Sequence, residues 1–221
     1  MKCPRCVQTI HRAADSCPHC GFSLADADAR FGGEDVRLRC LADTAGLLKR
    51  RDRERVEDAM EQFTQRFPQL FVAIYTGSLG ETGYLRQFGF WLLNRAAFED
   101  VPLEKPNSAG ILLVLDPESK MASLSFGYLL DAYLDERDTF DCLSRGHAHW
   151  LEERYADGMI KTISQLEQLL KKRARQARWN ADRFERRVSP VAKNADRVLQ
   201  IRLGHRPAKS APVSVHEEVP R

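Results

Sequence analysis

The residues most able to do chemistry lie within the first 20 positions, where four of the six cysteines form two Cys-x-x-Cys pairs. The pairs are Cys3 with Cys6 and Cys17 with Cys20, separated by ten residues. Each pair can fold into a tight turn whose two thiolates converge. Two such turns facing each other supply the tetrahedral four-sulfur coordination that is typical of structural zinc. The sequence therefore predicts a zinc site formed by these four cysteines.

The alternative chemistry is a redox Cys-x-x-Cys site, which needs a scaffold that places an exposed thiol of low pKa at a helix N-terminus. Residues 1–24 are too few to build that scaffold or a hydrophobic core, so metal binding would have to supply the folding free energy. The pattern over residues 3–20 resembles the bacterial zinc-ribbon family, which implies a structural zinc ion. His19 lies between the ligands and could replace one. Cys40 and Cys142 are expected to be small buried apolar residues.

Composition divides the rest of the chain into four segments. Residues 25–35 are small, acidic and glycine-containing, which predicts a linker. Residues 36–170 hold nearly all aromatic and β-branched side chains, so the core must lie there. Residues 171–187 are strongly basic with helical spacing, and 188–221 contain four prolines among small and polar residues, which predicts a disordered tail.

Apolar periodicity within the core segment changes in an informative order. Helix-like and strand-like patterns alternate, which predicts an α/β fold in which helices cover a sheet as an α-β-α sandwich. The zinc ribbon precedes this domain and the basic helical tail follows it. The expected order is α-β-α-β-β-α-α. Helices are expected at 49–67, at 82–98 and in a nearly continuous helical region from 135 to about 187 that contains the last two. Strands are expected at 70–75, 109–115 and 121–126, the last two joined as a hairpin.

Three short strings in the core segment are also informative. They lie at 41–48 (LADTAGLL), 107–114 (NSAGILLV) and 127–131 (GYLLD). In order and spacing, the region from 38 to about 170 resembles the TPM domain, a family that includes thylakoid-lumen phosphatase-like and photosystem-repair proteins and animal receptor-modulating proteins. The resemblance implies a sheet sandwiched between helices, a divalent cation site, typically for calcium, and weak acid phosphatase activity in some members.

The same resemblance implies particular acidic ligands. Asp43 matches the acid that opens the D-x-A-G-L-L string, and Asp116 matches the acidic position after the second strand. Asp131 stands where the family usually has glutamate, and the next acidic position falls on Asp135 or Glu136. Oxygen donors on such loops could hold Ca²⁺ or Mg²⁺. The alternatives are a helix-cap or turn role for Asp43 and a turn role for Asp116.

Charge is distributed unevenly along the chain. Residues 171–221 contain 14 Lys and Arg against 5 Asp and Glu, whereas residues 1–170 contain 20 against 26. A basic tail behind an acidic body predicts a partner for residues 171–187, which is nucleic acid, an anionic membrane surface or another acidic protein. The alternative is a solvated helix followed by a disordered end.

Hydropathy and motif content limit the function. No apolar run approaches the roughly 20 residues of a membrane span, and the N-terminus lacks the apolar core of a secretion signal, so we expect a cytoplasmic protein. Three functions compete: a non-enzymatic binding or scaffolding protein with a protein partner, a metal-dependent weak acid phosphatase, and a nucleic-acid-binding protein. The adapter-like arrangement of segments favours the first.

Overall fold

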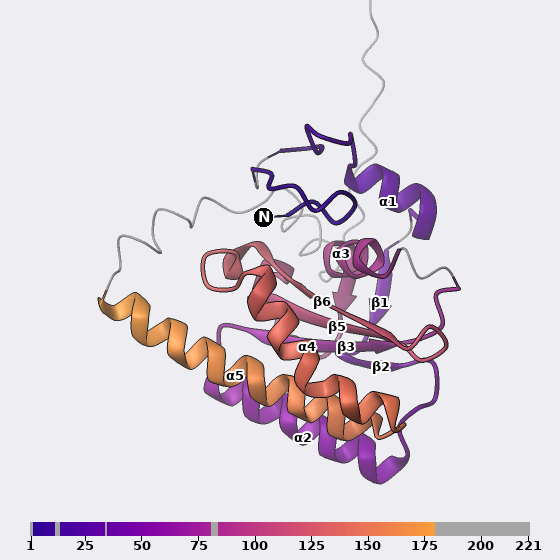
Figure 1. Cartoon of the computed structure of the whole chain (residues 1–221), viewed down its shortest axis with the longest axis vertical. Coiled ribbons are helices and arrows are strands. Elements are labelled where there is room, and N and C mark those ends of the chain that lie inside the picture. Colours follow the sequence, from indigo (N-terminus) through magenta and orange to yellow (C-terminus); the bar gives the residue numbers. More distant parts are fainter. Residues whose placement is uncertain (1, 12–13, 34, 81–83, 180–221) are drawn as a thin grey trace, which may run out of the picture.

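The computed structural model describes residues 2–11, 14–33, 35–80 and 84–179, and Figure 1 shows their arrangement. Within them, every helix is too short or too polar to span a lipid bilayer. The helices are α1 (Leu24–Phe31), α2 (Arg50–Arg66), α3 (Leu85–Arg95), α4 (Glu136–Leu151) and α5 (Tyr155–Trp179), with 3₁₀ turns η2 (Asn107–Ala109) and η3 (Tyr128–Leu130). The strands are β1 (Val36–Leu38), β2 (Leu41–Asp43), β3 (Phe71–Thr76), β4 (Ala96–Phe98), β5 (Gly110–Asp116) and β6 (Met121–Phe126).

A four-stranded sheet with the order β2-β3-β5-β6 forms the centre of the molecule. Strands β2, β3 and β5 are parallel, and β6 runs antiparallel to β5 after a hairpin. All seven residues of β5 are buried, as expected for a central strand covered on both faces. A second sheet pairs β1 with β4 in parallel.

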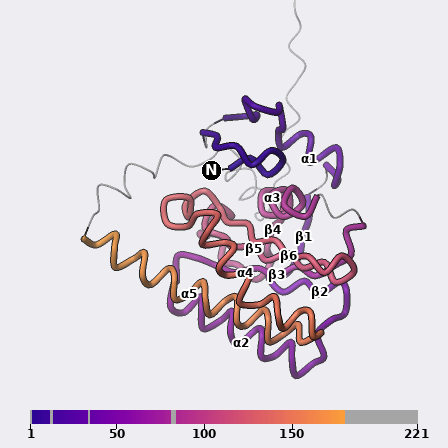
Figure 2. Tube along the Cα trace, in the orientation of Figure 1, coloured from indigo at the N-terminus to yellow at the C-terminus, as the bar shows by residue number. Residues whose placement is uncertain are grey.

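Helices cover the main sheet on both faces. Helix α3 packs on β5 and β6, and α1 packs on α3. On the other face lie α2, which contacts β3, and the paired helices α4 and α5, of which α5 also packs along α2. Figure 2 shows the N-terminal segment beside α3, on the side of the sheet away from α2 and α5. The predicted α/β fold with helices on both sheet faces is confirmed.

One predicted helix is shorter than its periodicity suggests. The pattern over 82–98 continues to Phe98, but α3 ends at Arg95 and the next three residues form β4. The side-chain amide of Asn107 donates to the carbonyls of Leu93 and Ala96 at 2.9 and 2.6 Å. These bonds satisfy carbonyl groups at the C-terminus of the helix. Because Asn107 lies eleven residues further on, no local pattern predicts this end.

The predicted linker at 25–35 is corrected by the structure, because most of it belongs to helix α1. The Ser23 side chain accepts from the N–H of Asp26, and the Asp26 carboxylate accepts from the N–H of Ser23 at 2.8 Å. This reciprocal capping box starts a helix even in a segment of small acidic residues. Ala27 is buried against the body.

The long helical region after Asp135 consists of two helices that form a hairpin. Helix α4 ends before Glu152, and Glu153 adopts a positive φ of 59°. Where the helices meet, a Cβ at either Gly146 or Gly158 would collide with the Trp150 ring, so glycine at both positions allows this close approach. The predicted tail at 188–221, and the part of the basic helix beyond Trp179, lie outside the described residues.

Helix α5 continues through position 170, where composition places the end of the core domain. Arg173 donates from Nη2 to both carboxylate oxygens of Asp138 at 3.1 and 2.9 Å. Asp138 is buried, and its carboxylate also accepts from the N–H of Asp135 at the start of α4. Arg173 therefore joins the beginning of the basic segment to the body of the domain.

Replacing Arg173 with alanine should lower the free energy of unfolding by about 1–3 kcal/mol, because it removes charged hydrogen bonds to a buried carboxylate. Urea denaturation measures the change. The exposed Arg175 is the matched control, and its replacement with alanine should stay within about 0.5 kcal/mol of wild type. Equal effects of the two substitutions would show that the Arg173 contact contributes nothing to stability.

Candidate metal centre

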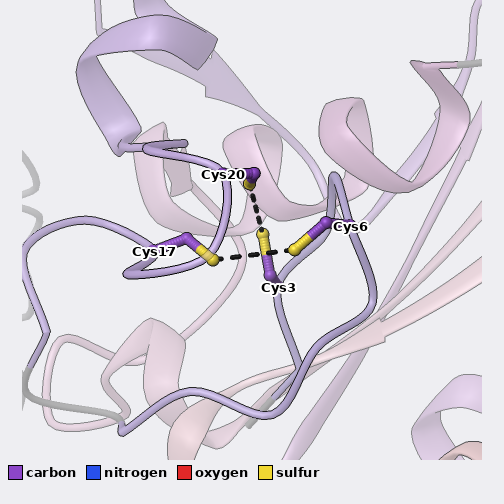
Figure 3. Close-up of side chains that lie close together, drawn as sticks. All are labelled: Cys3, Cys6, Cys17 and Cys20. Atoms are coloured by element: carbon purple, nitrogen blue, oxygen red, sulfur yellow. Dashed lines mark hydrogen bonds between the residues drawn. The ribbon is translucent and has the colours of Figure 1, made fainter.

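The four N-terminal cysteines converge on one point. Sγ of Cys3 lies 3.7 Å from Sγ of Cys20, and Sγ of Cys6 lies 3.6 Å from Sγ of Cys17, as Figure 3 shows. All four sulfur atoms lie within 4.8 Å of one another. Four sulfurs on a tetrahedron with metal–sulfur bonds of about 2.3 Å would be about 3.8 Å apart. The cluster therefore has the dimensions of a four-thiolate metal site.

Both Cys-x-x-Cys turns have the same backbone hydrogen bonds. The N–H of the first cysteine donates to the carbonyl five residues on, and the N–H four residues on donates to the carbonyl of that cysteine. These bonds join Cys3 to Gln8 and Val7 at 2.9 and 3.0 Å, and Cys17 to Phe22 and Gly21 at 2.8 Å in both cases. The residue four positions on has a φ of 63° at Val7 and 73° at Gly21. A β-branched valine adopts such a φ only where its surroundings impose it, so the turn geometry is strongly determined.

The environments of the thiols differ between the two turns. Burial raises the pKa of Cys3 to about 12. Burial also acts to raise the pKa of Cys17, but hydrogen bonds from the backbone N–H groups of His19 and Cys20 and from the thiols of Cys6 and Cys20 together lower this pKa to about 6. A metal ion must displace the proton from each thiol that is still protonated. Metal binding should therefore release protons and strengthen as the pH rises.

Aromatic side chains connect the cysteine-containing segment to helix α3. Phe22, two residues after Cys20, packs edge-on against Phe90 with ring centroids 5.9 Å apart. At the other end of α1, the ring of Phe31 lies 5.4 Å from that of Phe88 and 5.6 Å from that of Trp91. Aromatic pairs at these separations stabilise beyond their buried area. Residues 2–11 and 14–33 thus form a unit, hereafter the ribbon unit, that is docked on α3.

Two ion pairs reinforce this docking. Arg95 at the end of α3 makes a two-pronged contact with the Asp28 carboxylate on α1, with Nε donating at 2.7 Å. The Arg95 side chain is only 7% exposed, so the pair is largely desolvated. At the exposed rim, Lys2 lies 2.9 Å from Glu136 at the start of α4. The ribbon unit is therefore held to the body by apolar and charged contacts together.

The carboxylate of Asp43, the first predicted acidic ligand, is buried and has several hydrogen-bond partners within the fold. Its side chain is 1% exposed and accepts from the N–H groups of Leu47 and Leu48 at 3.0 Å each and from the hydroxyl of Thr76 at 2.5 Å. Arg53 Nη2 lies 3.6 Å from Oδ2. Burial alone would raise the pKa of Asp43, but these donors and the Arg53 charge together lower it. The carboxylate anchors the loop between β2 and α2.

Asp116 lies near Asp43 along the sheet edge but has its own partners. Strand register places both at the carboxyl ends of parallel strands, on either side of β3. Asp116 accepts from the N–H groups of Glu118 and Ser119 at 3.0 and 3.3 Å, so it organises the hairpin turn to β6.

The third predicted acidic position, Asp131, follows η3. In the part of the chain that the structure describes, only the four cysteines form a group of three or more potential metal ligands. The three aspartates are not brought together in this way.

The remaining sequence predictions are placed as follows. Asp135 is the N-cap of α4, and Glu136 contacts Lys2 and also Arg86 at 3.5 Å. Cys40 and Cys142 are buried as predicted, and burial raises the pKa of Cys142 to about 12. Sequence reasoning missed Thr76 and Arg53 as partners of Asp43. Thr76 directly follows the strand predicted at 70–75, but its pairing with Asp43 depends on sheet register that local patterns do not reveal.

Comparison with known proteins identifies the domain. The model of the TPM domain family matches residues 41–169, so the chain belongs to this family, and the resemblance seen in the sequence is confirmed. No curated protein matches. Among solved structures, the N-terminal domain of a P. gingivalis protein is 22% identical and covers 61% of this chain and 83% of its own, with a TM-score of 0.47. The N-terminal domain of a Corynebacterium glutamicum protein is 10% identical, with 59% and 78% covered and a TM-score of 0.43.

Replacing Asp43 with asparagine should lower stability at neutral pH by about 1–3 kcal/mol, because an amide cannot accept all of these hydrogen bonds. The folded-state pKa is lowered, so the ionised carboxylate stabilises the fold above its ordinary pKa of 3.8 and this contribution is lost as the pH falls through the folded value. Denaturation of both proteins across the acid range should show the difference shrinking toward low pH. A difference that is independent of pH would contradict this role.

Proposed function

We propose that this protein is a non-enzymatic binding or scaffolding protein, in which a structural zinc ribbon is fixed to a TPM domain. The observation that carries the proposal is the docking of the ribbon unit on α3 through Phe22, Phe31 and Asp28. A four-thiolate set leaves no coordination position open for substrate, which is typical of structural rather than catalytic zinc. Thiolate donors in tetrahedral geometry also favour zinc over calcium or magnesium.

The contacts that the acidic residues already make support a non-enzymatic role. Asp43 already accepts from two backbone N–H groups and one hydroxyl. The cation beside it is the Arg53 guanidinium, which a bound Ca²⁺ or Mg²⁺ would have to displace. A cation site made of Asp43, Asp116 and Asp131 would compete with the backbone hydrogen bonds that Asp43 and Asp116 already accept. The phosphatase alternative therefore needs a rearrangement of this sheet edge.

The arrangement of the chain supports a protein partner. A metal-stabilised unit is fixed to one face of the sheet, and a basic helix continues from the other face. This is the layout of an adapter, which presents several surfaces on one rigid body. A cytoplasmic location belongs to the same proposal, because a reducing compartment keeps cysteines available as metal ligands.

The zinc part of the proposal predicts one zinc ion per chain in protein purified without chelators. Native mass spectrometry measures the stoichiometry, and a Cys3→Ser/Cys20→Ser variant should lose the ion. Metal removal should also lower the melting temperature of the whole domain and increase binding of a hydrophobic dye, since a loosened ribbon unit uncovers Phe88 and Trp91 on α3.

The matched control for the zinc experiment is Cys40→Ser, because Cys40 is buried but lies outside the cluster. This variant should keep its zinc. Wild-type protein without zinc, or a double serine variant that retains it, would contradict the assignment. Loss of zinc with an unchanged melting temperature would keep the metal site but show that it does not stabilise the body.

The non-enzymatic part predicts at most weak hydrolysis of a generic phosphate ester, with or without added Ca²⁺ or Mg²⁺. Steady-state assays of wild type and Asp43→Asn provide the test, and the residual rates should be the same. Turnover near the median enzyme value of about 10 s⁻¹ that disappears in the variant would favour the metal-dependent phosphatase instead.

A further inference from the structure

The C-terminal end of α5 projects beyond the body of the domain. Arg55 pairs with Asp157 and Arg66 with Glu167, so α2 and α5 run side by side in the same direction. Helix α2 ends at Arg66, and α5 continues for several turns past that level, as Figure 1 shows. The apolar stripe of α5 ends at Leu170. From there to Trp179 the helix extends about 14 Å.

The exposed side of this projection carries a concentrated positive charge. Lys171, Lys172, Arg175 and Arg178 are exposed and, at 3.6 residues per turn, occupy about a third of the helix circumference. Arg173 points the other way, to Asp138. Lys171 has a carboxylate partner, Glu167 at 3.0 Å. Within the described residues, no carboxylate lies within ion-pair distance of the other three exposed cations. They are available to an external anion.

An aromatic side chain lies on the same face. Trp179 is 88% exposed, and its position on the helix falls between those of Lys172 and Arg175. A tryptophan this exposed buries almost no apolar area and therefore contributes little to the stability of the fold. A cationic surface with one accessible aromatic ring combines phosphate contact with base stacking, which is how proteins bind single-stranded nucleic acid without sequence preference.

A membrane surface fits this end of α5 less well. A helix that lies in the lipid interface needs an apolar face to bury among the acyl chains. The apolar face of α5, which includes Met159, Ile163, Leu166 and Leu170, is already buried in the domain. The face left to solvent offers cations and a single tryptophan.

We propose that the exposed face of α5 formed by Lys171, Lys172, Arg175, Arg178 and Trp179, hereafter the basic face, binds single-stranded nucleic acid. The cations contact phosphate groups and the tryptophan stacks on a base. This goes beyond the proposed scaffolding function, because it identifies one class of partner and the surface that receives it. The basic face contains no residue of the ribbon unit, which packs on α3 on the opposite side of the sheet.

The test is fluorescence anisotropy of a labelled oligothymidylate titrated with the full chain at several salt concentrations. Three or four phosphate contacts give a slope of log affinity against log salt of about −2 to −3. Each of Lys172→Gln, Arg175→Gln and Arg178→Gln should weaken binding roughly fivefold at about 0.1 M salt and reduce the slope by about 0.7. Lys161→Gln is the matched control, because it removes one exposed charge from the same side of α5, ten residues before Lys171.

Stacking is tested separately. Binding should quench tryptophan fluorescence in wild type but not in Trp179→Phe, and Trp179→Ala should weaken binding to single strands at least about fivefold while affecting duplex less. Melting temperatures of all variants should match wild type, which excludes misfolding as the cause. Absence of binding, variants that bind like wild type, or binding only to phosphatidylcholine vesicles that contain phosphatidylserine would overturn the proposal.

Discussion

The burial of β3 and β5 on both faces is the constraint from which the layers of this protein follow. Both strands are almost wholly apolar and lie in the middle of the sheet, so each face must be covered. Helix α3 covers one face, and eight of its eleven residues are themselves buried. A helix that is buried nearly all round needs a second covering on its outer side. The ribbon unit supplies this covering, so it forms an outer layer of the fold.

The ribbon unit and α3 consequently depend on each other. The unit has few apolar residues of its own and gains much of its burial from α3, through Phe22 and Phe31. In return it desolvates Arg95 and supplies the Asp28 carboxylate that this buried cation requires. A buried charge left without its partner is costly. Any ion that stabilises the cysteine cluster therefore also stabilises α3 and, through it, the sheet.

The sequence predicts those features that depend on the spacing and periodicity of neighbouring residues. The spacing of the four cysteines predicted their convergence. The periodicity of 49–67 predicted α2, two apolar runs predicted β3 and β5, and the alternation over 121–126 predicted β6. The features that the sequence did not predict depend on contacts between residues that are far apart in the chain. Strands β1 and β4 have three residues each and are defined by pairing with each other. Likewise, the Asp43 carboxylate could be identified as a turn anchor or a metal ligand, but its bond to Thr76 spans 33 residues.

The structure also explains how the uneven charge of the chain is arranged in space. Counted along the sequence, the basic segment begins at Lys171, and composition treats it as separate from the acidic body. On helix α5, some side chains of this segment point toward the body and others point toward solvent. Arg173 turns inward and neutralises Asp138, whose carboxylate completes the capping box of α4. The neighbouring cations turn outward, where nothing in the described body neutralises Lys172, Arg175 or Arg178. Arg173 thus adds a charged contact to the apolar packing that holds α5 on the body, while helix geometry gathers the outward charges on one face.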